Sequence, residues 1–201
     1  MRHLSLAIGL ACSFTSSCLP LPLWVGYYEP TASGSERRQS TCQDQVGPFD
    51  KVVFSGPRGV NVDVVSRSHE KGILVCLSIT VPKGVTVRFL DNLFVARSLP
   101  SGSETSRRVS VMSAGHNYPE SCGLWTESPR DIFAPLEGGF KRPSPWKSFN
   151  MPYYSALMFD GVDPDRFSLT LPALLVDGDE FSIPEVVFRR THRFVVYPLN
   201  C

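Results

Sequence analysis

Aromatic rings and hydrogen-bonding side chains are interleaved through residues 113–154. Flat rings stack on sugars or anchor a protein partner, and polar neighbours fix the orientation of what is bound. The alternative is that the rings fill a secondary hydrophobic core under a long loop. Four aromatic residues are our candidates for a binding site in this segment: Trp125, Trp146, Tyr153 and Tyr154.

His116 begins the same segment and is followed by Glu120. An imidazole near a carboxylate is a common pair in general acid–base catalysis. The chain has no Gly-x-Ser-x-Gly sequence to supply a nucleophile, and the histidines beyond the N-terminus are far apart in sequence. We therefore name no catalytic residue, keep His116 as a candidate binding residue, and rank a hydrolase as the least favoured function.

Carboxylates gather in two short segments, residues 160–165 and 177–180. Calcium prefers clustered oxygen ligands on loops, but neither segment matches the twelve-residue calcium loop. Asp and Gly are also the residues that β-turns require, so we favour turns and expect a hairpin at Asp177-Gly178. The chain has no Cys-x-x-Cys and no paired histidines, so we expect no metal and no other cofactor.

Residues 1–17 have a short positive start, an apolar run and a small-residue end, which is the pattern of a secretory signal peptide. The apolar run is too short to span a bilayer. The alternative is a short buried N-terminal element. Residues 15–18 resemble a bacterial lipobox, although Thr15 stands where leucine is usual. We favour lipidation of Cys18 over ordinary cleavage after Ser17, and over Cys12, whose apolar run would be very short.

The remaining cysteines suit an oxidising compartment. If Cys12 leaves with the signal and Cys18 carries lipid, four cysteines remain and can form two disulfides. Four cysteines allow three connectivities, and the sequence does not choose among them. A buried free thiol is the alternative for the one in an apolar strand. The four candidates are Cys42, Cys76, Cys122 and Cys201.

The composition indicates a globular protein with no overall charge. Hydrophobic residues make up 42% of the 201 residues and charged residues 19%, which argues against disorder. Lysine and arginine number 20 against 19 acids, and Arg2 is the only charged residue in 1–17, so 19 bases face 19 acids in the mature chain. Such a chain has no global electrostatic reason to bind nucleic acid, and we expect none as a partner.

A period of two dominates the chain from residue 50, which predicts β-strands. Seventeen prolines and 15 glycines indicate many turns and few helices. We expect an antiparallel β-sandwich with one long irregular segment over residues 113–152, preferably immunoglobulin-like, with an open barrel as the alternative. The expected strands are 51–55, 60–65, 73–81, 85–89, 93–96, 108–112, 153–159, 167–171, 173–176, 181–183, 186–188 and 194–197.

These observations predict three parts: a signal peptide over 1–17, an anchor and linker over 18–48, and a β-sandwich domain over 49–201. Aromatic residues in the linker, such as Trp24, would dock on the domain or lie at a membrane surface. We expect an exported, non-catalytic module of the bacterial periplasm or membrane-anchored cell envelope that binds an envelope protein. Binding of a carbohydrate, such as peptidoglycan, through the aromatic-rich segment is the second hypothesis.

Overall fold

The computed structural model describes residues 22–39, 49–109, 113–114, 131–133 and 150–196. These residues form strands joined by turns, one of them a 3₁₀ turn over Pro57–Gly59, and no α-helix occurs among them. The described part of the chain accordingly contains no helix that is long and apolar enough to cross a membrane.

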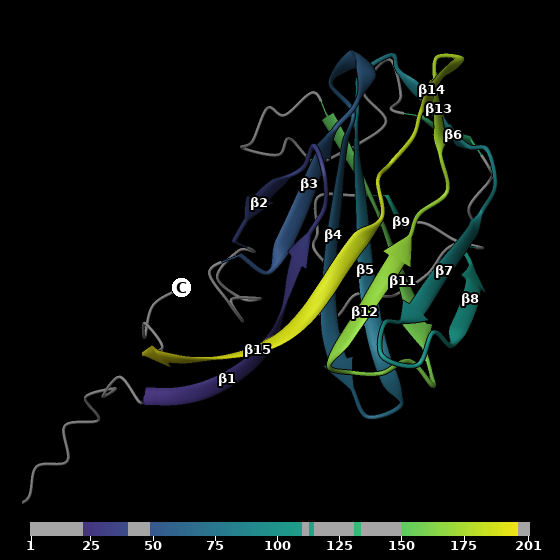
Figure 1. Cartoon of the computed structure of the whole chain (residues 1–201). Coiled ribbons are helices and arrows are strands. Elements are labelled where there is room, and N and C mark those ends of the chain that lie inside the picture. Colours follow the sequence, from purple (N-terminus) through teal and green to yellow (C-terminus); the bar gives the residue numbers. More distant parts are fainter. Residues whose placement is uncertain (1–21, 40–48, 110–112, 115–130, 134–149, 197–201) are drawn as a thin grey trace, which may run out of the picture.

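The strands form three sheets, and all of the strand pairs are antiparallel (Figure 1). Sheet A contains, in order, β1 (Pro22–Thr31), β15 (Val186–Val196), β12 (Arg166–Thr170), β7 (Leu93–Ser98) and β8 (Glu104–Arg108). Sheet B contains β2 (Glu36–Arg38), β3 (Lys51–Ser55), β4 (Asn61–His69), β5 (Gly72–Pro82), β11 (Asn150–Phe159) and β9 (Ser113–Ala114). Sheet C contains β10 (Asp131–Phe133), β6 (Thr86–Phe89), β13 (Leu174–Val176) and β14 (Asp179–Phe181).

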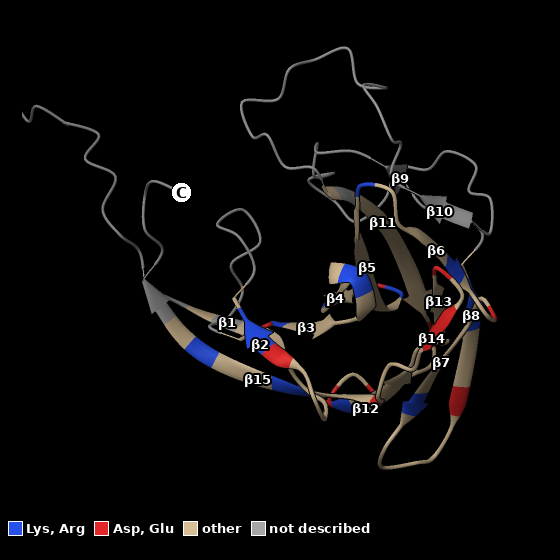
Figure 2. Ribbon diagram, turned by 90° about the horizontal axis from the view of Figure 1, so that it is seen from above, with Lys and Arg blue, Asp and Glu red and all other residues tan. Residues whose placement is uncertain are grey.

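Sheets A and B enclose one hydrophobic core, with strands of sheet A on one side and those of sheet B on the other (Figure 2). The antiparallel β-sandwich expected from the sequence is confirmed. The finer, immunoglobulin-like arrangement is not confirmed. Alternation explains the burial: along β5 every second residue from Ile73 to Val81 is buried, while those between them are only partly covered.

Aromatic rings of sheet A pack against one another inside this core. Phe167 of β12 stacks on Phe188 of β15, with centroids 4.8 Å apart, and Tyr28 of β1 meets Phe167 edge-on at 5.6 Å. The hydroxyl of Ser68, on β4, donates a hydrogen bond of 3.4 Å to the Tyr28 hydroxyl oxygen. Tyr28 is therefore a core residue that connects sheet A to sheet B.

The expectation of a linker over 18–48 is wrong for its described part. β1 pairs with β15 through ten consecutive positions, and β2 pairs with β3. Pro22 and Pro30 are compatible with β1 because it is an edge strand of sheet A, where a missing N–H need not break the sheet. Residues 18–21 and 40–48 of this segment lie outside the described residues.

Other strand predictions were wrong in detail, including 181–183, where β14 instead covers Asp179–Phe181. The stretches 186–188 and 194–197 were expected to be separate strands, but Val186–Val196 is one strand, β15. The polar residues between them do not interrupt it because this half of β15 pairs with β1 and projects from the sandwich as a two-stranded ribbon (Figure 1). A strand was expected over 108–112, whereas β8 covers Glu104–Arg108, an exposed edge strand with little hydrophobic signal. Residues 110–112 lie outside the described residues.

Candidate functional site

Most of the residues that the sequence singled out lie outside the described part of the chain. The predictions that concern them stay predictions, including a signal peptide over 1–17. The residues in question are Cys18, Cys42, His116, Cys122, Trp125, Trp146 and Cys201.

Tyr153 and Tyr154 lie next to each other on β11 and therefore point to opposite faces of sheet B. Tyr153 is opposite Ile79 and packs against the core, and burial raises the pKa of its hydroxyl above the ordinary value. Tyr154 is opposite Ser78, on the other face. The two rings cannot form one platform for a sugar, so at most Tyr154 belongs to an outward-facing binding surface.

Cys76 lies in the middle of β5, opposite Val65 of β4 and Ala156 of β11. Its neighbours Val75 and Leu77 are buried in the core, so Cys76 lies on the face of sheet B that is turned away from sheet A. The other five cysteines of the chain fall outside the described residues, and the two expected disulfides stay a prediction.

The carboxylate segments serve as turns. Asp177 has a φ of 49° and Gly178 a φ of 94°, as a two-residue hairpin between β13 and β14 requires, so the hairpin predicted at this position is confirmed. An Asp177 side-chain oxygen accepts a hydrogen bond of 2.9 Å from the Thr86 N–H. Asp163 likewise accepts one of 2.7 Å from the Asp165 N–H. Among the described residues no cluster of three or more His, Cys, Asp or Glu side chains could hold a metal.

The described histidines have local partners or neighbours. His69 ends β4, is exposed, and its Nδ1 accepts a hydrogen bond of 3.2 Å from the Lys71 N–H. His192 lies on the ribbon opposite Gly26, and a Cβ atom placed at Gly26 would be 3.4 Å from the imidazole. Glycine at this position therefore leaves room for the imidazole to lie across the neighbouring strand.

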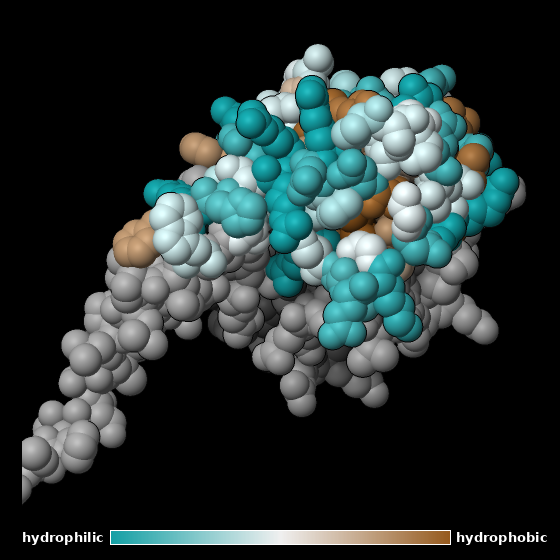
Figure 3. Space-filling model, turned by 60° about the horizontal axis from the view of Figure 1, so that its bottom comes forward, coloured by the Kyte–Doolittle hydropathy of each residue, from teal (hydrophilic) through white to brown (hydrophobic). Residues whose placement is uncertain are grey.

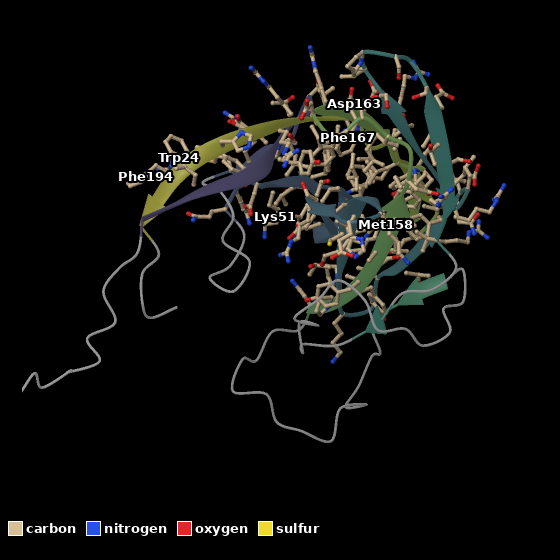
Figure 4. The ribbon with its side chains drawn as sticks, turned by 90° about the horizontal axis from the view of Figure 1, so that it is seen from below. Trp24, Lys51, Met158, Asp163, Phe167 and Phe194 are labelled. Carbon is tan, nitrogen blue, oxygen red and sulfur yellow. The ribbon has the colours of Figure 1, made fainter. Side chains whose placement is uncertain are left out.

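The projecting ribbon carries an exposed aromatic pair at its end (Figure 4). Trp24 of β1 and Phe194 of β15 are directly opposite each other, with ring centroids 5.8 Å apart and planes at 66°. Trp24 is 74% exposed and Phe194 50%. From below, apolar side chains are exposed at this end of the described chain and are separated from the other apolar areas by hydrophilic surface (Figure 3). We call these two residues the ribbon tip.

Basic residues follow the ribbon tip along β15. Arg189, Arg190 and Arg193 are exposed. Glu29 is the one acid on β1 and is opposite Arg189. Its carboxylate forms an ion pair of 2.9 Å with Arg37 of β2. Residues 22–27 and 191–196 contain Arg193 and His192 but no acid. The outer half of the ribbon is therefore apolar at its tip and positive beside it.

Tyr27 lies at the base of this outer half. Burial is the main cause that raises the pKa of its hydroxyl above the ordinary value of 10.0, and the negative charge of Glu29 adds to the effect. The positive charge of Arg193 acts in the opposite direction but is the weaker influence. Tyr27 is thus neutral over the whole physiological range.

Sequence reasoning found only half of the ribbon tip. It marked Trp24 as a docking or membrane residue, but it treated Phe194 as an ordinary strand residue, because the two are far apart in the chain. Only the pairing of β1 with β15 brings them together. Phe194 shares its strand face with two polar residues, His192 and Arg190. This was the one signal that this strand face leaves the core.

Comparison with known proteins gave no match to a family model, to a curated protein or to a solved structure.

Proposed function

We propose that this chain is an exported, non-catalytic binding module of the bacterial cell envelope, held to a membrane through lipid on Cys18, whose β-sandwich binds an envelope protein. The observation that carries the proposal is the position of β1. It begins at Pro22, four positions after Cys18, and is hydrogen-bonded to β15 from there on. An anchor at Cys18 would hold the sandwich next to the membrane with little slack, leaving its other end available to a partner.

Sheet C forms the end of the sandwich that lies away from the ribbon (Figure 1). The inner residues of β6 and β13 are buried, and the outer face carries a row in which Arg88, Leu175 and Glu180 are neighbours across three strands. Leu90 follows β6 beside this row and is 51% exposed. A partly exposed leucine between charges of both signs, with an exposed leucine beside it, forms a surface that a protein partner can cover with apolar and ionic contacts. We therefore place the partner on the outer face of sheet C.

The anchor is tested by expressing the full-length chain in a Gram-negative host and measuring its intact mass and membrane fraction. We expect acyl mass on a chain that starts at Cys18. Cys18→Ser should move the protein to the soluble periplasmic fraction, whereas the matched control Cys12→Ser should not. An unchanged membrane fraction for Cys18→Ser would rule out the anchor.

The partner is tested by photo-crosslinking in the same cells, with a photoreactive amino acid at position 90. We expect one defined crosslinked band that Arg88→Glu abolishes. The control position is Leu99, an exposed leucine in the turn between β7 and β8, where no such band should form. A band at both positions, or at neither, would contradict binding through sheet C. A ladder of glycan-linked products would instead favour carbohydrate binding.

A further inference from the structure

We propose that the ribbon tip, Trp24 and Phe194, inserts into the headgroup region of a membrane that contains anionic lipids. This inference rests on the proposed function for the position of the N-terminal segment, but its test does not require the anchor. The tip is exposed, and it lies at the outermost described end of the molecule, where β1 begins (Figures 1 and 4).

The arrangement of side chains along the ribbon suits a lipid surface. The two aromatic rings come first, then His192 opposite Gly26, and then Arg190 opposite Tyr28. Register places all of these on one face of the ribbon, so the face changes from apolar to polar toward the sandwich and ends at Arg190, whose guanidinium also lies 3.9 Å from the Asp165 carboxylate. The boundary between lipid and water has the same order, and Trp rings with nearby Arg residues concentrate there.

The charge near the tip favours anionic lipids over neutral ones. Arg193 directly precedes Phe194 in β15 and is exposed. No acid occurs in the outer half of either strand. Glu29, the one acid of β1, is engaged by Arg37. Basic side chains near an anionic membrane surface each add to the attraction, which falls off within a Debye length.

The length of the chain keeps the tip close to the proposed anchor. Trp24 is six positions after Cys18. A fully extended chain of this length spans about 20 Å at roughly 3.4 Å per residue. If Cys18 carries lipid, its Cα lies at the membrane surface, and the tip is the first folded part of the molecule to meet the headgroups.

The experiment uses the full-length chain with Trp125→Phe and Trp146→Phe, which leaves Trp24 as the only tryptophan. The purified protein is mixed with vesicles of phosphatidylcholine, with or without phosphatidylglycerol, whose acyl chains carry bromine near the headgroup. We expect a blue shift and quenching of the Trp24 emission with the anionic vesicles. Phe194→Ala should weaken partitioning by about ten-fold, as expected for losing the burial of one ring.

Two variants control this result. Leu90→Ala removes an exposed apolar side chain at the other end of the sandwich and should leave partitioning unchanged. Arg193→Gln should weaken binding to the anionic vesicles, and added salt should remove the difference between this variant and the parent.

The outcomes separate this inference from the proposed function. Acylated protein whose Trp24 emission is not quenched would overturn the inference and leave the anchor standing. Quenching of a protein that carries no acyl group would support the inference and refute the anchor. A Trp24 emission that shifts only when envelope protein is added, and never with vesicles, would overturn the inference in favour of a protein partner at the tip.

Discussion

Gly72 is the position at which a single methyl group should most disturb the sandwich. It starts β5 with a φ of +144°, a conformation that side chains rarely adopt. A Cβ atom there would lie 2.2 Å from the carbonyl oxygen of Phe159, the last residue of β11. An ordinary contact begins at 3.4 Å, so the two strands would have to separate by 1.2 Å, the difference between these distances.

The cost of Gly72→Ala follows from two contributions. The strained backbone costs about 1–3 kcal/mol. Moving the end of β11 away from β5 weakens one or two backbone hydrogen bonds, at about 1 kcal/mol each. We therefore expect Gly72→Ala to lower the free energy of unfolding by about 2–5 kcal/mol. At a urea dependence of about 2 kcal/mol per molar, the unfolding midpoint falls by about 1–2.5 M.

The matched control is Gly102→Ala. Gly102 also has a positive φ, +71°, but nothing lies within 4 Å of the added Cβ, so only the backbone term applies, about 1 kcal/mol. Urea unfolding followed by circular dichroism measures both variants. If Gly72→Ala cost no more than Gly102→Ala, the close approach of β5 to Phe159 would be refuted.

Three further predictions use the core, the ionisable tyrosines and the cysteines. Phe167→Ala removes the ring that contacts both Tyr28 and Phe188 and should cost about 3–5 kcal/mol of unfolding free energy in urea, whereas the exposed Leu99→Ala should cost far less. Because the pKa of Tyr27 is raised above 10.0, its neutral form stabilises the fold fully below pH 10, and this contribution is lost as the pH rises through the folded pKa. Absorbance at 295 nm should therefore show Tyr27 ionising late, and the wild-type protein should lose stability above pH 10 more steeply than Tyr27→Phe. Exported protein should show four alkylatable cysteines only after reduction, as mass spectrometry would reveal; thiols that react before reduction would contradict the expected disulfides.

Alternation in the sequence was sufficient to predict much of the sandwich. β5 was predicted within one residue at each end, because one of its faces lies in the core and buried residues therefore alternate with partly covered ones. β3 was predicted with its observed bounds as a short apolar run, and its three central residues are all buried. The Asp177-Gly178 hairpin was predictable for a different local reason: both positions need a positive φ.

The failures share a physical cause. β1 carries two prolines and few alternating apolar residues, so nothing local marks it as a strand, and its stability comes from pairing with β15 at the far end of the chain. The part of β15 after Phe188 has a similar problem, because residues such as Arg190 and His192 are polar on a face that is not covered by the sandwich. The sequence cannot show that a polar stretch is a strand when a distant partner supplies its hydrogen bonds.

The same division applies to function. The sequence by itself determined the residue types on which the anchor and disulfide predictions depend, and the turns that explain the acidic segments, since these depend on neighbours along the chain. Only the tertiary structure decided that Tyr153 and Tyr154 face opposite ways, that Trp24 and Phe194 meet at the end of a projecting ribbon, and that this ribbon follows Cys18 almost directly. Exposure of a side chain depends on what packs over it, and for a β-sandwich that is set by strands that are remote in sequence.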